Sequence, residues 1–317
     1  MISFNETSNV VKLSNGSIDY AVYINTEGYL ETIYFGKSIR DFNPETMRTA
    51  PKWHDETHVY DPATGSERWF ADGFKQNVAP LELSPHARRD KRGAPIICAR
   101  DNGSFATDFL YVSHRVFNGA EPLVGLPSAH GDNCSTVEFL LRERTRELYV
   151  KHRITIFDDC DVVVKNYTII NKTGSDATLS RAMSMQLDLP RNNYTLTHFS
   201  GRWAAERNAV TNKLVDGVQE VSSNLGATSA EENTFAYLAE LGATYTHGEV
   251  IGLNLVYSGN FKLRTFSDMW GGTHITYGIN DEDFSWVLAD GDSFVTPQAV
   301  VCYSSDGIDG MSRNMHD

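Results

Sequence analysis

The sequence has 317 residues, of which 41% are hydrophobic and 22% charged, and its formal net charge is −13 at pH 7. A chain of this length and apolar content can bury a sizeable core, in one large β domain or two ordinary ones, and its composition argues against wholesale disorder. The negative charge argues against a nucleic-acid partner, because affinity for nucleic acid comes mainly from neutralising phosphates.

The first predicted elements are two strands joined by a turn. In SIDYAVYI, residues 17–24, every second residue is apolar and these residues share one face: Ile18, Tyr20, Val22 and Ile24. The stretch YLETIYFG, residues 29–36, follows a turn signal at Glu27-Gly28. An alternation with a period of two predicts half-buried β-strands on both sides of this turn.

The alternation stops between Phe42 and Ala94. This stretch, called here the excursion, mixes charged residues with five prolines, Pro44, Pro51, Pro62, Pro80 and Pro85. A long irregular segment inside a compact domain is usually functional or disordered. The aromatic residues of the excursion favour an ordered, packed loop: Trp53, Tyr60, Trp69, Phe70 and Phe74.

Two long strands are predicted within residues 148–174, LYVKHRITIFDDCDVVVKNYTIINKTG, with a turn at Asp158-Asp159. One face of the first strand carries Val150, His152, Ile154 and Ile156, and one face of the second carries Val162, Val164, Asn166, Thr168 and Ile170. Similar stretches continue to residue 304. Together they predict an all-β fold, an antiparallel sandwich of many strands with few short helices.

The last thirteen residues, SDGIDGMSRNMHD, break this pattern and predict the start of a helix. Asp309 is the expected N-cap, because its side chain can accept a hydrogen bond from a free backbone N–H group. Met311 and Met315 are four residues apart and would share one helix face.

Four cysteines, Cys98, Cys134, Cys160 and Cys302, lie far apart without a CxxC pair. This spacing predicts reduced thiols in a cytoplasmic protein and no metal site. The N-terminus lacks the basic and apolar regions of a signal peptide, and no apolar run approaches the ~18 residues of a membrane span.

No motif for a catalytic nucleophile, a zinc site or a phosphate loop is present. Strand spacing cannot establish the carboxylate pair, about 5 to 9.5 Å apart, that a glycosidase needs. The aromatic residues favour sugar binding, because a flat indole stacks on the apolar face of a pyranose while nearby polar groups fix its hydroxyls. The candidates are Trp53, Trp69, Trp203, Trp270 and Trp286.

Packing competes with ligand contact at each of these positions. Trp286, in FSWVL, is expected at a core position of a strand, and Trp203, in SGRWAAER, is expected to pack in the core or in a loop. For Trp53 and Trp69, both in the excursion, packing and ligand contact remain equally open. The histidines on strand-like segments are expected to be satisfied core or surface groups rather than general bases: His114, His152 and His198.

Six stretches, taken in order, resemble the N-terminal domain of bacterial α-galactosidases of glycoside hydrolase family 36. They are GYLETIYFGKSIRD, DFLYVSHRVFNGAEPLVGLPSAH, RAMSMQLDLP, FSGRWAAERN, GEVIGLNLVYSGNF and FSWVLADGDSFVTPQAVVCYSSDGIDGMSRNMH. They span nearly the whole chain in the family's order, and LVYSGNF followed by GMSRNMH makes the resemblance specific.

The resemblance implies a β-supersandwich of the kind seen in galactose mutarotases over residues 1–304. Residues 305–317 would begin a helical linker to a (β/α)8 barrel. In the family this barrel carries two catalytic aspartates and hydrolyses terminal α-1,6-galactosides such as melibiose and raffinose with retention. None of the barrel's motifs occurs here, so the resemblance implies a fragment or a natural truncation without a catalytic residue or hydrolytic activity of its own.

In the family's tetramers a long loop of this domain closes over the active site of a neighbouring subunit and supplies an acid and an arginine. The excursion corresponds to that loop. Arg68 matches the arginine, and Asp55 is the best match for the acid, with Glu56 beside it. The implied partners are α-galactoside sugars bound in trans, also by Trp53 and Trp69, and a homo-oligomer. No cofactor, metal, nucleic acid or membrane is implied.

The chain departs from the family where Glu82-Leu83-Ser84 replaces the pattern E-Y-P and where GATSAEENTF lacks the usual histidine. These departures concern subunit contacts and substrate range. Two other interpretations stay open. A free-standing carbohydrate-binding protein would bind galactosides alone, whereas an aldose mutarotase-like enzyme would need a His and a Glu converging on the concave face of the sheet.

Overall fold

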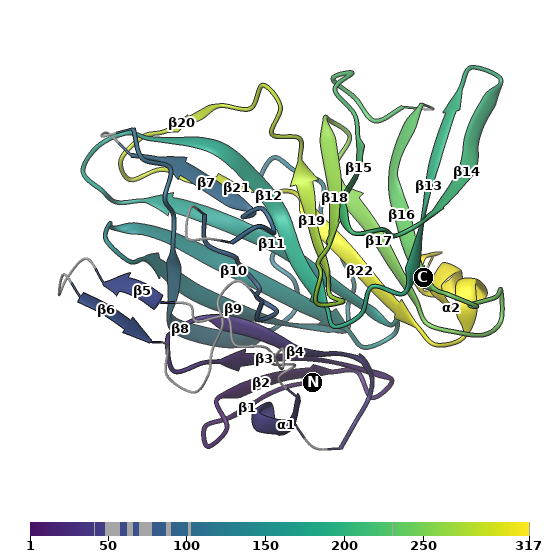
Figure 1. Ribbon diagram of the computed structural model, residues 1–317, viewed down its shortest axis with the longest axis horizontal. Coiled ribbons are helices and arrows are strands. Elements are labelled where there is room, and N and C mark those ends of the chain that lie inside the picture. Colours follow the sequence, from purple (N-terminus) through teal and green to yellow (C-terminus); the bar gives the residue numbers. More distant parts are fainter. Residues whose placement is uncertain are drawn as a thin grey trace.

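The computed structural model describes residues 1–40, 42–47, 58–61, 66–69, 78–86, 90–100, 103–229 and 231–316. In these residues the strands pair antiparallel in three sheets and one separate hairpin (Figure 1). The all-β prediction is therefore confirmed. Neither α1 nor α2, the helices of the described residues, has the length and apolar character that a membrane-spanning helix needs.

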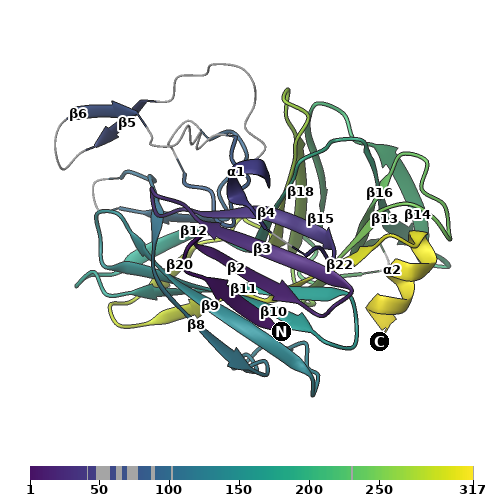
Figure 2. The same ribbon diagram turned by 90° about the horizontal axis from the view of Figure 1, so that it is seen from below.

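The first sheet is a four-stranded meander near the N-terminus, β1 (Ile2–Asn5), β2 (Val10–Ser14), β3 (Ile18–Ile24) and β4 (Leu30–Lys37). The inward face predicted for β3 is confirmed, since its four residues all belong to the main core, but the strand is not half-buried because Asp19 and Ala21 on its other face are also buried. The turn before β4 contains Gly28 at φ 85°, a backbone conformation that favours glycine. In Figure 2 this sheet lies over the strands of the second sheet.

The second sheet has ten strands and runs from β8 at one side of the molecule to β14 at the other (Figure 1). Nine follow the order β14-β13-β16-β17-β22-β11-β10-β9-β8, and β21 also pairs with β11. Their bounds are β8 (Phe109–Asn118), β9 (Cys134–Glu143), β10 (Leu148–Phe157), β11 (Val162–Asn171), β13 (Tyr194–Arg202), β14 (Ala205–Lys213), β16 (Glu232–Glu240), β17 (Val250–Val256), β21 (Ser293–Val295) and β22 (Gln298–Ser304).

The two long predicted strands are β10 and β11, paired in continuous register from Leu148↔Asn171 to Ile156↔Val163. The face expected for β10 is buried. On β11, however, the main core takes Val163, Tyr167 and Ile169, the alternate set to the predicted one. Val162 and Val164 are buried as well, in a second cluster. Because both faces of β11 are covered near its start, alternation alone did not identify the inward face.

The third sheet has six strands, in the order β15-β18-β19-β12-β20, with β7 also paired to β12. Their bounds are β7 (Ile96–Ala99), β12 (Ala177–Leu189), β15 (Gly217–Ser222), β18 (Phe261–Ser267), β19 (Thr273–Ile279) and β20 (Trp286–Leu288). The 13-residue strand β12 pairs with β7 and β20 in its first half and with β19 in its second. Its far end, near Asp188, lies at the pocket described below.

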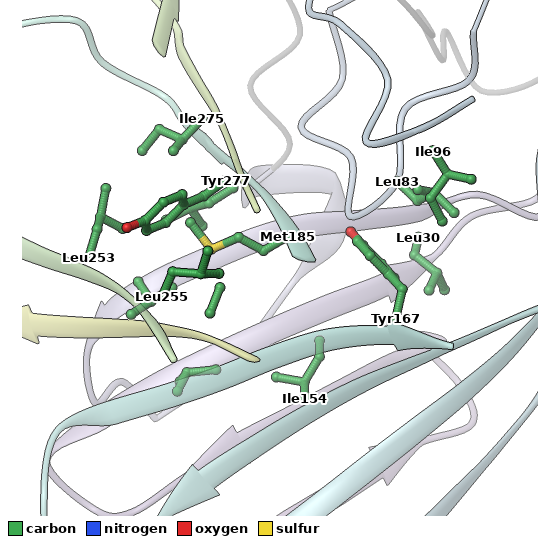
Figure 3. Close-up of a cluster of buried hydrophobic side chains, with 14 of the residues drawn as sticks. Leu30, Leu83, Ile96, Ile154, Tyr167, Met185, Leu253, Leu255, Ile275 and Tyr277 are labelled. Carbon is green, nitrogen blue, oxygen red and sulfur yellow. The ribbon is translucent and has the colours of Figure 1, made fainter. Parts of the chain in front are cut away.

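The main core lies between these sheets (Figure 3). Figure 3 shows Leu30 of β4, Tyr167 of β11, Met185 of β12 and Tyr277 of β19 side by side. Leu83, from the end of the excursion, joins the same cluster. The last part of the excursion is therefore packed between sheets, and Leu81 forms an isolated bridge to Glu31 of β4.

The earlier part of the excursion contains α1 (Pro44–Met47) and the hairpin β5 (His58–Asp61) and β6 (Ser66–Trp69). In this hairpin His58 pairs with Trp69 and Val59 with Arg68.

The predicted C-terminal helix is present as α2 (Gly307–His316), but Asp309 is not its N-cap. The helix starts two residues earlier, so Asp309 lies in its first turn. The backbone N–H groups of Gly307, Ile308 and Asp309 donate to carbonyls of Gly248, Thr244 and Tyr245 in the β16–β17 loop. Backbone oxygens thus satisfy the first turn of the helix. Met311 is buried against β17 and β22, with Met315 beside it as predicted.

Candidate functional site

A pocket of about 430 Å³ lies among β4, the end of β12 and the hairpin between β18 and β19. Part of its wall is apolar, from Ile33, Leu189, Pro190 and Ile251. The rest carries ionisable and aromatic side chains: Tyr34, Asp188, Arg191, Tyr194, Glu249, Asp268, Trp270, His274 and Tyr303. A concave site with apolar walls and a few convergent polar groups is typical of small-ligand binding.

Asp268 organises the hairpin that presents Trp270 to the pocket. Its Oδ1 accepts hydrogen bonds from the backbone N–H groups of Trp270 at 2.9 Å and Gly272 at 2.8 Å. Its Oδ2 lies 2.8 Å from Nε2 of His274. Aspartate favours such turns because its short side chain can bond the backbone two residues on. Trp270 is 40% exposed on this fixed turn.

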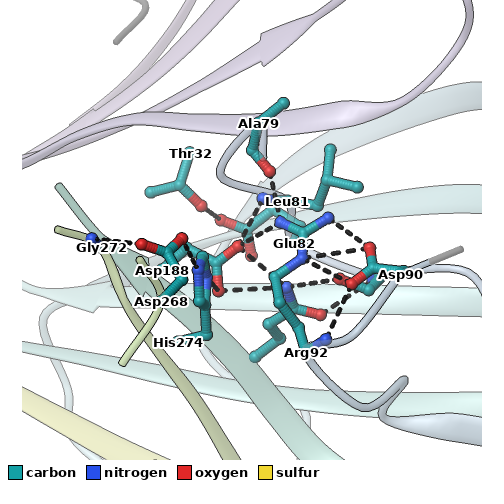
Figure 4. Close-up of polar contacts among 12 residues, drawn as sticks. Thr32, Ala79, Leu81, Glu82, Asp90, Arg92, Asp188, Asp268, Gly272 and His274 are labelled. Carbon is teal, nitrogen blue, oxygen red and sulfur yellow. Dashed lines mark hydrogen bonds and ion pairs between the residues drawn. The ribbon is translucent and has the colours of Figure 1, made fainter. Parts of the chain in front are cut away.

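His274 links the hairpin to the buried interior (Figure 4). Its Nδ1 is in ion-pair contact with Oδ1 of Asp188 at 3.0 Å, and Oδ2 of Asp188 accepts from Nη1 of Arg92 at 2.7 Å. Arg92 also forms a buried ion pair with Asp90. Burial by itself would lower the pKa of His274, but the two carboxylates outweigh it and raise that pKa to about 9. The imidazole is therefore protonated at neutral pH.

Glu249 forms the opposite wall. Nη2 of Arg191 donates to both of its oxygens at 2.8 Å, and the hydroxyls of Tyr194 and Tyr303 donate at 2.7 and 3.3 Å. Burial, reinforced by the nearby carboxylate, raises the pKa of both tyrosines. They are thus proton donors throughout the physiological range, and Glu249 is held by four hydrogen bonds.

A second buried network lies behind the pocket, centred on Glu82. Its Oε2 lies 2.8 Å from Nε2 of His152 and 2.7 Å from Nζ of Lys165, and all three side chains are 0% exposed. Burial lowers the pKa of His152 despite the carboxylate, so the imidazole is neutral. The mutarotase interpretation requires a His and a Glu side by side, as His152 and Glu82 are. This pair lies in the core, where a sugar has no access, and His152 is a satisfied core group as predicted.

The charged state of His274 gives a pH-dependent stability. A histidine whose pKa is raised by folding contributes its full stability below its pKa in the unfolded state, about 6.5. This contribution is lost as pH rises through its pKa in the folded state. We expect the free energy of unfolding to fall between pH 7 and pH 9 by up to roughly 2 kcal/mol, measured by urea denaturation.

The substitution His274→Gln is expected to remove most of this decrease, whereas His130→Gln, at an exposed histidine, is expected to keep it. An unchanged pH profile in His274→Gln would show that another group is responsible.

The residues predicted to bind substrate are only partly described. Trp53 and Asp55 lie outside the described residues. Arg68 and Trp69 are on β6, where their backbones pair with Val59 and His58 of β5. Their side chains lie outside the described part of the structure.

Two tryptophan predictions are wrong. Trp286, expected in the core, is 50% exposed, and Trp203, expected to be packed, is 91% exposed at the β13–β14 turn. Trp286 belongs to β20, a three-residue strand at the edge of its sheet, where Val287 on the opposite face is exposed too. Period-two patterns do not distinguish an edge strand from a central one.

Sequence reasoning missed most of the pocket. It named Trp270 as a sugar-binding candidate but did not name Asp188, Glu249, Asp268 or His274. A signal was present in RAMSMQLDLP, where Gln186 and Asp188 interrupt an apolar strand. A buried polar residue in a strand requires partners, so such positions point to a network.

Comparisons with known proteins agree with this fold. The sequence model of the glycosyl hydrolase family 36 N-terminal domain matches residues 28–289. The alpha-galactosidase AgaA of Geobacillus stearothermophilus is 32% identical over 100% of this chain, which spans 43% of that protein. The chain therefore has less than half the length of this relative.

Solved structures give the same result. The crystal structure of the alpha-galactosidase AgaB from Geobacillus stearothermophilus matches with a TM-score of 0.91 and 31% identity, over 99% of this chain and 42% of that chain. A variant of AgaA in complex with raffinose matches with a TM-score of 0.89 and 31% identity, over 96% and 42% of the two chains. On the sequence match, the relatives and the shared fold, the chain belongs to the glycosyl hydrolase family 36 N-terminal domain family.

Proposed function

We propose that this chain acts as the non-catalytic N-terminal domain of an α-galactosidase that hydrolyses terminal α-D-galactosyl residues with retention. The observation that carries the proposal is the match to alpha-galactosidases along the entire chain. The raffinose bound to the AgaA variant supports galactosides of the melibiose and raffinose type as substrates. The catalytic aspartates would belong to a (β/α)8 barrel, and residues 305–317 would begin the connection to it.

We further propose that the excursion supplies groups to a galactoside held at the active site of a neighbouring subunit. Asp55 and Arg68 would fix sugar hydroxyls, since a carboxylate accepts hydrogen bonds from them and a guanidinium donates to them. Trp53 and Trp69 would stack on the sugar ring. Described residues of the excursion support its placement at a ligand site, because Met47 and Val78 both line the pocket. This arrangement requires a homo-oligomer, for which we propose a tetramer in the cytoplasm.

The test measures hydrolysis of melibiose and raffinose by two proteins, the 317-residue chain alone and the product of its complete reading frame. We expect activity in the second protein and none in the first. Hydrolysis by the chain alone would contradict a non-catalytic domain. Absence of activity on every α-galactoside by the longer protein would overturn the proposed function.

In the active protein, Arg68→Ala is expected to lower kcat/KM roughly 10- to 100-fold, since a hydrogen bond to a charged group contributes about 1.5–3 kcal/mol. The matched control is Arg202→Ala, at an exposed arginine of the β13–β14 hairpin. An equal effect of both substitutions would contradict a role for Arg68 in substrate binding.

A further inference from the structure

We propose that the pocket bounded by Trp270, Asp268, Arg191 and Glu249 is a binding site for a neutral pyranose sugar within the sandwich itself. The inference goes beyond the proposed function, because the four residues that bound the site lie outside the excursion and sugar binding there requires no hydrolysis. The volume of the pocket, about 430 Å³, falls in the range of roughly 300–1,000 Å³ that is typical of small-ligand pockets.

The charges in the pocket favour a neutral ligand over an ion. Each carboxylate already has a cation beside it, Glu249 with Arg191 at 2.8 Å and Asp188 with Arg92 at 2.7 Å. The imidazolium of His274 lies between Asp188 and Asp268. A charged ligand that displaced Arg92 or His274 from Asp188 would break a buried ion pair, which costs several kcal/mol per ion, and displacing Arg191 would leave Glu249 without its cation. A neutral ligand leaves every pair intact.

Hydrogen-bonding capacity remains for hydroxyl groups. Arg191 is 45% exposed, and its contacts to Glu249 and Glu240 leave part of its five-donor fork unused. Asp268 accepts three hydrogen bonds, and a carboxylate has about four acceptor positions. The pocket thus offers one hydrogen-bond donor and one acceptor. Sugar hydroxyls can pair with both, because a hydroxyl both donates and accepts hydrogen bonds.

Trp270 supplies the apolar surface that a pyranose needs. Among the described residues its indole N–H has no hydrogen-bond partner, and 40% of the residue is exposed beside the pocket. The turn that carries Trp270 is held by Asp268, which contacts His274. His274 in turn contacts Asp188, and Asp188 contacts Arg92 (Figure 4). A rigid, partly exposed indole next to polar groups lowers the ordering cost of binding.

The experiment follows the indole N–H resonances of the five tryptophans of this chain by NMR during titration with galactose, glucose and gluconate. Single substitutions assign each resonance. We expect the Trp270 resonance to shift saturably with a neutral sugar, with a Kd on the order of 1 mM. The Trp203 resonance is the internal control, because this residue is even more exposed than Trp270 but lies on the β13–β14 turn and does not line the pocket.

Trp270→Ala is expected to weaken sugar binding, measured by calorimetry, roughly tenfold or more, while Trp270→Phe keeps part of the affinity and Trp203→Ala keeps all of it. Equal affinity in Trp270→Ala and Trp203→Ala would overturn the proposal, as would the lack of a saturable shift with either neutral sugar. Tighter binding of gluconate than of glucose would contradict a site for neutral ligands. Because no turnover is measured, these outcomes are separate from those that test hydrolysis.

Discussion

Replacing Lys165 by methionine is expected to lower the free energy of unfolding by about 3–5 kcal/mol, the cost of leaving a buried charge without its partner. Nζ of Lys165 lies 2.7 Å from the carboxylate of Glu82 and donates to the hydroxyl of Tyr20 at 2.7 Å and the carbonyl of Gln186 at 2.9 Å. The side chains of Lys165 and Glu82 are both fully buried. Without the ammonium group, Glu82 keeps only neutral hydrogen-bond donors around it.

The pH dependence of this loss distinguishes a charge effect from a packing effect. Burial would raise the pKa of Glu82, but Lys165 and His152 outweigh it and lower the pKa well below the ordinary value. The native protein therefore loses this contribution only in strong acid, as pH falls through that lowered value. In Lys165→Met, protonation of the unpaired Glu82 carboxylate removes the buried charge and stabilises the folded variant. The difference in free energy of unfolding between the variant and the native protein is therefore expected to shrink as pH falls.

The double variant Lys165→Met/Glu82→Gln is expected to be more stable than Lys165→Met alone, because no lone charge remains. Urea denaturation followed by circular dichroism measures all four corners of the cycle. Lys213→Met, on the exposed strand β14, is the control and is expected to change stability by less than about 0.5 kcal/mol. A double variant that is less stable than both single variants would contradict the ion-pair account.

Replacing Arg92 by methionine is expected to lower the free energy of unfolding by a similar amount, about 3–5 kcal/mol, and also to disturb the pocket. Arg92 is 1% exposed, and its Nε donates to Asp90 at 2.9 Å while Nη1 donates to Asp188 at 2.7 Å. Both carboxylates are buried. Methionine fills much of the volume but leaves Asp90 without its guanidinium.

The effect on the pocket follows from the contacts of Asp188, which is shared between Arg92 and His274. We expect Arg92→Met to shift the indole resonance of Trp270, although Trp270 does not touch Arg92, and to leave that of Trp203 unchanged. Arg92→Lys keeps a charge but not the planar fork, so an intermediate loss of stability is expected. If Trp270 is unaffected in both variants, the hairpin is held independently of this network.

Much of the fold could be predicted from the sequence, because local alternation and turn residues determine it. The faces of β3 and β10 and the turn at Asp158-Asp159 follow from a period of two and from turn chemistry. The inward face of β11 did not follow, since neighbouring elements cover both of its sides near Val163. The core position predicted for Trp286 was wrong for the opposite reason. Its strand lies at the edge of a sheet and has fewer neighbours than the alternating pattern implies.

The candidate site was mostly beyond prediction, because its residues meet only in the folded chain. The backbone N–H of Ser84 donates to Gln186, 102 residues away, and that of Leu81 to Asp188, 107 residues away. No local pattern encodes such a distance. The family resemblance supplied the role proposed for the excursion, but it said nothing of Asp268 and His274.

The packing of Leu81 and Leu83, at the end of the excursion, between the sheets also constrains the order in which the protein assembles. The hairpin β10–β11 can form from neighbouring residues, but Lys165 cannot lose its water until Glu82 has arrived from a segment far away along the chain. Contacts of this separation are slow to form, because the loop must close before they contribute. The strands should therefore associate first around a hydrated interior. The arrival of the excursion's end would then expel the last water and complete the native state.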